Sequence, residues 1–191
     1  MRYKDQRVGV FVDVQNLYHS AKHLYGARVN FSEMLKSIVG SRILIRAIGY
    51  VVKSDLSAGE GPRSEKSRFS DPTNKSPEAN FFEALEKSGI ELRVKDLQIF
   101  AGGAKKADWD VGMAVDAIRA ADALDVVILV TGDGDFVPLV EYLKWGKGKQ
   151  VEVASFGRST SGRLKEVVDE YIDLDQNPKV LLKTKYSRKN N

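Results

Sequence analysis

Apolar segments typical of buried strands alternate along the chain with segments of helical periodicity, and this alternation limits the fold most strongly. Strands are expected at residues 8–12, 43–52, 90–94, 126–130 and 151–156. Helices are expected at residues 17–24, 30–40, 76–89, 108–121, 136–145 and 164–168. Such alternation produces a mostly parallel sheet with helices on both faces. We therefore expect a three-layer α/β/α fold around a central sheet of about five strands.

Length and composition indicate one globular domain, which we expect to span residues 1–175. The chain has 191 residues, of which 42% are hydrophobic, enough for a sizeable core. No apolar run approaches the roughly 18 residues of a membrane span, and the N-terminal segment lacks the apolar region of a signal peptide. The absence of cysteine excludes disulfides, thiolate catalysis and Cys-ligated zinc. These features predict a cytoplasmic protein without a membrane partner.

Two segments differ in character from the rest of the chain. Of the 25 residues from 53 to 77, 13 are Gly, Pro, Ser, Thr or Asn, which predicts a mobile insertion. This insertion either folds over a substrate or is simply disordered. Residues 176–191 hold five Lys or Arg and no acid, whereas the other residues carry a net charge of −1. The segment is therefore expected to be a basic tail, which either contacts nucleic acid or is a solvated terminus.

Four aspartates are expected to meet at one edge of the sheet. Asp13 ends the first strand, while Asp133 and Asp135 follow the fourth strand in the stretch LVTGDGDFVPLV. Asp110 begins the helix that leads into the fourth strand. In parallel sheets the carboxyl ends of the strands and the first turns of the connecting helices share one edge, where ligands bind. The alternative for Asp135 is a simple capping role at the helix N-terminus.

Several carboxylates placed together repel one another unless a cation lies between them. With no Cys and two His in the chain, hard oxygen ligands favour Mg²⁺ or Mn²⁺. Such an ion activates water and neutralises charge on a phosphodiester. The acidic cluster thus predicts metal-dependent phosphoryl or phosphodiester hydrolysis.

Three segments resemble the motifs of the NYN domain family, the PIN-like ribonucleases. These are FVDVQNLYHSA, KADWDVGMAVDA and LVTGDGDFVPLVEYL, in that order on alternating strands and helices. The following VEVASFGRSTSGRLKEVVDEYIDL is similar to the LabA-type branch, and the likeness covers roughly residues 7–174 apart from the insertion. The resemblance implies a PIN-like α/β fold and cleavage of single-stranded RNA with Mg²⁺ or Mn²⁺.

The resemblance also implies roles for individual residues. The acids that correspond to the metal-binding acids of the family are Asp13, Asp110, Asp133 and Asp135. Asn16 matches the asparagine after the first acid, and Thr131 matches the small hydroxyl residue before the later pair. Asp116 also falls in a motif. Its position is about 240° around the helix from Asp110. We therefore expect its side chain to point away from the other acids, for example toward a basic side chain, and rank it second.

Other candidate residues each have two interpretations. Trp109 either stacks on a base or packs against the protein, and Lys106 either holds a phosphate or is an ordinary loop charge. Arg158, in the loop GRSTSG, either binds an RNA phosphate or belongs to a simple helix cap. His19 and His23 have the spacing of a metal pair without a third ligand nearby in sequence, and a substrate contact by His19 is the better interpretation.

The leading hypothesis is a metal-dependent endoribonuclease that cleaves single-stranded RNA. The alternative is a non-catalytic RNA-binding or regulatory module that retains the fold. A phosphatase with an aspartate nucleophile would need a second acid two residues after Asp13, where Gln15 stands instead. The sequence leaves a homodimer open.

Overall fold

A six-stranded parallel sheet forms the centre of the protein, with the strand order β4-β3-β1-β7-β8-β9. The computed structural model describes residues 3–53, 76–96, 98–99, 105–106 and 109–183. The strands of the sheet are β1 (Arg7–Asp13), β3 (Ile43–Val52), β4 (Glu91–Lys95), β7 (Val126–Val130), β8 (Gln150–Ser155) and β9 (Glu170–Asp173). Two short antiparallel pairs join β2 (Ala27–Val29) to β10 (Leu181–Lys183) and β5 (Gln98–Ile99) to β6 (Lys105–Lys106).

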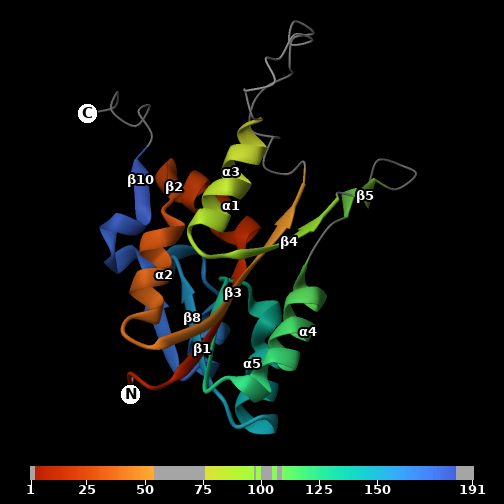
Figure 1. Ribbon diagram of the computed structural model, residues 1–191, viewed down its shortest axis with the longest axis vertical. Helices are drawn as coiled ribbons and strands as arrows, with labels where there is room; N and C mark the ends of the chain where they lie inside the picture. Colours follow the sequence, from red (N-terminus) through yellow and green to blue (C-terminus); the bar gives the residue numbers. More distant parts are fainter. Residues whose placement is uncertain (1–2, 54–75, 97, 100–104, 107–108, 184–191) are drawn as a thin grey trace, which may run out of the picture.

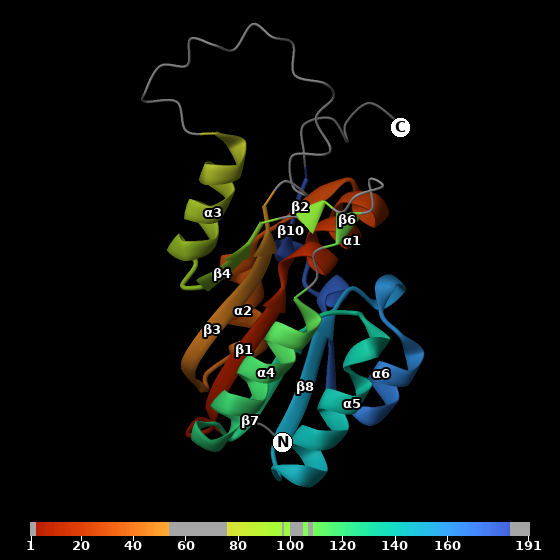
Figure 2. The same ribbon diagram turned by 90° about the vertical axis from the view of Figure 1, so that its right-hand side faces the viewer.

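Helices cover both faces of the sheet and make it the middle of three layers (Figures 1 and 2). One face packs against α1 (Val14–Tyr25), α2 (Phe31–Val39) and α3 (Pro77–Lys87). The other face packs against α4 (Asp110–Ala120), α5 (Val137–Glu141) and α6 (Gly162–Val167). Alternate residues of β1 enter the two cores, with Val10 in the first and Phe11 in the second, because successive side chains of a strand point to opposite faces.

Local sequence signals account for the ends of the first two helices. The Asp13 carboxylate caps α1 by accepting the backbone N–H of Asn16, and α1 ends at Gly26 in the left-handed conformation, with φ 56°. The side chain of Asn30 caps α2 in the same way, by accepting the N–H of Glu33. Apolar residues on one side of each helix then pack against the sheet, which supplies most of the stability of helices this short.

The predicted three-layer α/β/α architecture with a mostly parallel sheet is confirmed. The five expected strands are present as β1, β3, β4, β7 and β8, and the sheet has β9 as a sixth strand. The prediction that α1 begins after Asn16 is wrong, because Asp13 is the cap and Asn16 lies inside the helix. The helix expected at 136–145 is composite: a 3₁₀ turn (Gly134–Phe136), α5 and a π-helical turn (Tyr142–Gly146).

The two segments of unusual composition lie largely outside the described residues. For the insertion expected at 53–77, the structure describes only its ends, where Ser76 caps α3. The C-terminal boundary expected at 175 is not the end of the packed chain. Val180 is fully buried and β10 pairs with β2, because the apolar residues after Pro178 complete the first core. The first residues of the segment expected as a tail are therefore part of the packed chain, and residues 184–191 lie outside the described residues.

A fully buried ion pair ties α2 to the sheet at the end opposite the acids. The Arg42 guanidinium contacts both carboxylate oxygens of Glu152 at 2.6 and 2.9 Å, and it also donates to the carbonyl oxygens of Ile38 and Val39. The two charged side chains are 1% and 0% exposed.

Among the described helices, none has the length and apolar character needed to cross a membrane.

Candidate functional site

The candidate site lies at the carboxyl edge of the sheet, where the central strands β1 and β7 end side by side. Asp13 is the last residue of β1 and is partly buried. One of its carboxylate oxygens, Oδ1, accepts the N–H of Asn16 at 3.0 Å, and the other, Oδ2, accepts the hydroxyl of Thr131 at 3.2 Å. Asp13 therefore has a fixed orientation, because both oxygens are held by neighbouring elements.

Hydrogen bonds hold the segment from Thr131 to Asp133 beside the N-terminal end of α1. The fully buried Thr131 hydroxyl accepts the N–H of Asp133 at 3.2 Å while it donates to Asp13. The side-chain oxygen of Asn16 accepts the N–H of Gly132 at 3.0 Å. Asn16 and Thr131 thus hold the backbone after β7 in place beside Asp13.

Asp133 and Asp135 occupy different positions in the turn that follows. Oδ1 of Asp133 accepts the N–H of Asp135 at 2.9 Å, so that Asp133 rather than Asp135 caps the 3₁₀ turn. The side chain of Asp133 is partly buried, whereas Asp135 is exposed. The capping role considered for Asp135 therefore belongs to Asp133.

Asp110 approaches the site from α4, and Trp109 fixes the start of that helix. The indole N–H of Trp109 donates to the carbonyl oxygen of Val51 at 2.9 Å, and its ring lies 5.5 Å from that of Tyr50. A Cβ atom at Gly112 would lie 2.6 Å from the indole ring, so only glycine permits this packing. Trp109 therefore packs against the protein.

The electrostatic environment of Asp13 shows that Asp110 and Asp133 lie close to it. The pKa of Asp13 is raised from 3.8 to about 6, chiefly by burial and also by the negative charges of Asp110 and Asp133, while hydrogen bonds from Asn16 and Thr131 act in the opposite direction. The structure thus brings Asp110 and Asp133 into electrostatic range of Asp13. The exposed Asp135 adjoins them in sequence.

The donors at this edge have the chemistry that a hard divalent cation requires, but their geometry does not form a closed site. Within the part of the chain that the structure describes, no group of three or more Asp, Glu or His side chains converges closely enough to hold a metal ion. Oxygen donors are the ligands that Mg²⁺ and Mn²⁺ prefer, and a cation would relieve the repulsion around Asp13. The residues present therefore fit such an ion by their chemistry and charge.

The loop between β8 and α6 forms a wall of the site. The N–H of Ser161 donates to the carbonyl oxygen of Gly132 at 2.9 Å, and a Cβ atom at Gly132 would collide with the backbone of Ser159. Ser161 precedes α6 without a side-chain capping bond. Arg158 in the same loop is exposed, so its guanidinium is accessible to a ligand.

The remaining candidates lie outside the acidic cluster. Asp116 accepts a hydrogen bond from the Tyr50 hydroxyl at 3.1 Å and lies 3.6 Å from the guanidinium of Arg93. It therefore pairs with a basic side chain, as expected. Tyr50 was missed at the sequence level, although it is the register partner of Asp13 in the neighbouring strand. The backbone of Lys106 belongs to β6, and its side chain lies outside the described structure.

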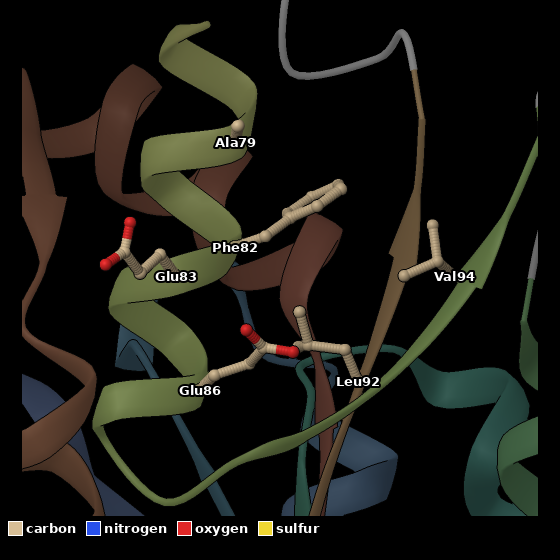
Figure 3. A pocket seen from close by; sticks show the side chains of 6 residues that line it. All are labelled: Ala79, Phe82, Glu83, Glu86, Leu92 and Val94. Atoms are coloured by element: carbon tan, nitrogen blue, oxygen red, sulfur yellow. The ribbon is translucent and has the colours of Figure 1, made fainter. Parts of the chain in front are cut away.

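A groove near one edge of the sheet does not coincide with the acids. It has a volume of about 520 Å³ and lies between α3 and β4, as Figure 3 shows. Its lining residues are Ala79, Phe82, Glu83, Glu86, Leu92 and Val94. None of the candidate site residues is among them.

The fold and the site together define a three-layer α/β protein with an acidic centre at the carboxyl edge of a parallel sheet. The chain belongs to the NYN domain family, because the family model for the NYN domain matches residues 7–175. The family suggested by the sequence motifs is therefore confirmed.

Individual relatives agree with this family. The chain is 29% identical over 101 residues to the low amplitude and bright protein LabA of Synechococcus elongatus, a match that covers 50% of this chain and 54% of that protein. The chain thus matches about half the length of this relative. A crystal structure of a protein of unknown function from Vibrio parahaemolyticus has a TM-score of 0.76 and 28% identity, and the match covers 95% of this chain and 99% of that one.

Proposed function

We propose that this protein is a divalent-metal-dependent endonuclease that hydrolyses phosphodiester bonds of single-stranded RNA. The observation that carries the proposal is the Asp13 carboxylate, whose pKa is raised to about 6 by burial and by the nearby Asp110 and Asp133. An uncompensated carboxylate in such surroundings is costly, and a bound cation would offset that cost. Membership of the NYN domain family supports the same function.

Each residue has a role in this proposal. The acids that would hold Mg²⁺ or Mn²⁺ are Asp13, Asp110, Asp133 and Asp135. The metal would supply an activated water and neutralise charge on the phosphodiester. Thr131 and Asn16 keep Asp13 and the Gly132 backbone oriented, and the exposed Arg158 would contact a substrate phosphate.

A cleavage assay with metal controls tests the proposal. Labelled single-stranded RNA, duplex RNA and DNA are incubated with the protein in Mn²⁺, in Mg²⁺ or in EDTA. Cleavage of single-stranded RNA is expected only with metal, and Asp13→Asn and Asp133→Asn should each lower the rate at least 100-fold. Asp122→Asn is the matched control, because Asp122 is 76% exposed and pairs with Lys147, away from the site. Equal cleavage by Asp13→Asn would remove Asp13 from the mechanism.

The second candidate function is an RNA-binding module without catalysis. One observation favours it: among the described residues, the acids do not converge into a ligand set of three. A metal titration separates the two functions, because a ligand that binds only the folded state raises its melting temperature by mass action. For a nuclease, micromolar to millimolar Mn²⁺ should raise the melting temperature of the native protein and not that of Asp13→Asn. Unchanged melting temperatures together with RNA binding would favour the non-catalytic module.

A further inference from the structure

The outer side of α1 carries both histidines of the chain as a pair of parallel rings. His19 and His23 have ring centroids 6.0 Å apart and an angle of 16° between their planes. The buried side of the helix consists of Val14, Leu17 and Ala21, which pack against the sheet. The two imidazoles lie on the opposite side of the helix, about half a turn from these residues. His23 is exposed and His19 is partly buried, so both imidazoles are accessible at least in part from the solvent.

This pair of rings continues a stripe that starts at the candidate site. Asn16, His19 and His23 are three and four residues apart, and such spacing places side chains on one face of a helix. Asn16 contacts two segments of the candidate site, since its backbone N–H donates to Asp13 and its side-chain oxygen accepts the N–H of Gly132. A ligand lying along this face would therefore lead directly to Asp13.

The charge of α1 is suited to an anionic polymer. Its sequence, VQNLYHSAKHLY, contains no acid, although the helix begins at an acidic cluster. Lys22 lies over the ring of Tyr18, 5.6 Å from its centroid, and the Tyr18 ring contacts His19 edge-on at 5.4 Å. The exposed Lys22 and His23 thus lie beside the partly buried rings of Tyr18 and His19, and this side of the helix combines aromatic rings with positive charge. Proteins that bind single-stranded nucleic acid use this combination, because rings stack on unpaired bases and cations attract the backbone.

We propose that the exposed face of α1 is a base-stacking surface for single-stranded nucleic acid, with His19 and His23 as the contacting side chains. This inference rests on the proposed function for the identity of the substrate, and it adds the path by which the strand reaches the acids. Duplex nucleic acid is excluded from such a contact, because its base faces are stacked inside the helix. A zinc site has less support, since no third protein ligand accompanies the pair within the described residues.

The fact that the chain has only two histidines makes the proposal directly measurable. The imidazole Cε1–H resonances of the full-length protein are followed by NMR during titration with a 12-nucleotide 2′-O-methyl oligoadenylate in EDTA, which prevents cleavage. Both resonances are expected to shift through the ring currents of stacked bases, and a duplex of equal length should leave them unchanged. Binding of the single strand without a shift of either resonance, or no binding at all, would overturn the proposal.

Substitutions give a second, independent readout. His19→Ala and His23→Ala should each weaken the affinity for the oligonucleotide about tenfold, a loss typical of one stacking contact. Tyr142→Ala is the matched control, because Tyr142 is an exposed aromatic residue on the opposite face of the sheet. Native affinity in the double histidine variant, with its melting temperature unchanged, would refute the stacking role. Shifts of both resonances with Zn²⁺ but not with the oligonucleotide would do the same.

Kinetics then separate this inference from the proposed nuclease activity. If both are correct, the double variant raises KM for single-stranded RNA and leaves kcat and the response to Mn²⁺ unchanged. Cleavage with an unaltered KM would refute the stacking surface and leave the nuclease intact. Absence of cleavage under all metal conditions, together with the expected NMR shifts, would refute the nuclease and retain the surface.

Discussion

The hydroxyl of Thr131 donates a hydrogen bond of 3.2 Å to the carboxylate of Asp13 and thereby joins the ends of two neighbouring strands, β7 and β1. The same oxygen accepts the N–H of Asp133. One buried side chain thus sets the distance between the first acid and the segment that carries the later pair. The arrangement of the candidate site depends on this contact as much as on the acids.

Thr131→Val removes this link while keeping the shape of the side chain. Without the hydroxyl, the Asp13 carboxylate loses a donor and the Asp133 N–H loses its acceptor. The position is fully buried, so these lost bonds are costly. We expect the free energy of unfolding to fall by about 1–3 kcal/mol and any metal-dependent cleavage to fall about tenfold. Urea denaturation and a cleavage assay measure the two effects. Thr131→Ser keeps the hydroxyl and should retain most of both, and equal losses in the two variants would contradict the role of the hydroxyl.

Asp13→Asn should stabilise the metal-free protein, and more so at high pH. Because the pKa of Asp13 is raised from 3.8 to about 6 by burial and by its acidic neighbours, the carboxyl stabilises the fold below pH 3.8 and this contribution is lost as the pH rises through about 6. In EDTA at pH 8 the variant should be more stable than the native protein by up to about 2–3 kcal/mol. At pH 4 the difference should nearly vanish. Chemical denaturation of both proteins at the two pH values measures their free energies of unfolding. A difference in stability that is the same at pH 4 and pH 8 would contradict the raised pKa.

Trp109→Phe tests whether the start of α4 positions Asp110. The substitution keeps an aromatic ring and removes only the N–H that donates to Val51. We expect the Mn²⁺ concentration for half-maximal binding to rise about fivefold, the loss typical of one hydrogen bond. Native Mn²⁺ affinity in Trp109→Phe would show that this bond does not position Asp110.

Equilibrium dialysis measures the Mn²⁺ affinity of both the native protein and Trp109→Phe. Fluorescence gives an independent check on the native indole, because Trp109 and Trp145 are the two tryptophans of the chain. In the Trp145→Phe variant, Trp109 is the sole emitter next to Asp110, so paramagnetic Mn²⁺ should quench its emission and Mg²⁺ should not. Trp145 is 84% exposed, and its replacement should leave stability within about 0.5 kcal/mol of the native value.

Glu152→Gln should be among the most destabilising single substitutions in this protein. It leaves the Arg42 guanidinium buried without its counter-charge, a change that typically costs about 3–5 kcal/mol. Glu91→Gln is the control, because it breaks the exposed pair with Arg46 and should cost less than about 1 kcal/mol. Urea denaturation of both variants measures the difference, and similar costs for the two would contradict the argument from burial.

Much of the architecture was predictable because long apolar strands carry a strong signal. β3 and β7 are rich in β-branched residues, and topology alone then places Asp13 and Asp133 at the same edge. Strands of three or four residues, such as β2, β9 and β10, are too short to show a period and form through pairing with distant partners. The capping role of Asp13 was missed because Asp and Asn cap helices equally well, and the choice depends on where the chain turns.

Side-chain partners far apart in sequence were the least predictable part of the site. The indole of Trp109 bonds to a carbonyl oxygen 58 residues earlier, at the end of β3. Arg42 pairs with a glutamate 110 residues later, and the sequence around either residue gives no sign of a buried ion pair. Such contacts follow from packing in three dimensions, which periodicity along the chain does not contain.

Gly132→Ala should disturb both stability and the site. A methyl group at this position would collide with the carbonyl oxygen of Ser159 and would also come within 3.2 Å of the Cα of Thr160. These atoms are backbone, so no side chain can turn aside, and the loop after β8 must move away from the strand end. That movement would break the bond from the Ser161 N–H to the Gly132 carbonyl oxygen and disturb the contact with Asn16.

We expect Gly132→Ala to lower the free energy of unfolding by about 1–3 kcal/mol, as overpacking typically does, and to reduce metal-dependent cleavage by a larger factor than Thr131→Val. Gly162→Ala is the matched control. A methyl group there has no atom within 4 Å, and the position is the first residue of α6, so alanine should leave stability and cleavage unchanged. Denaturation curves and cleavage rates of the two variants, measured together, test the claim. Native behaviour in Gly132→Ala would show that the loop after β8 is not a fixed wall of the site.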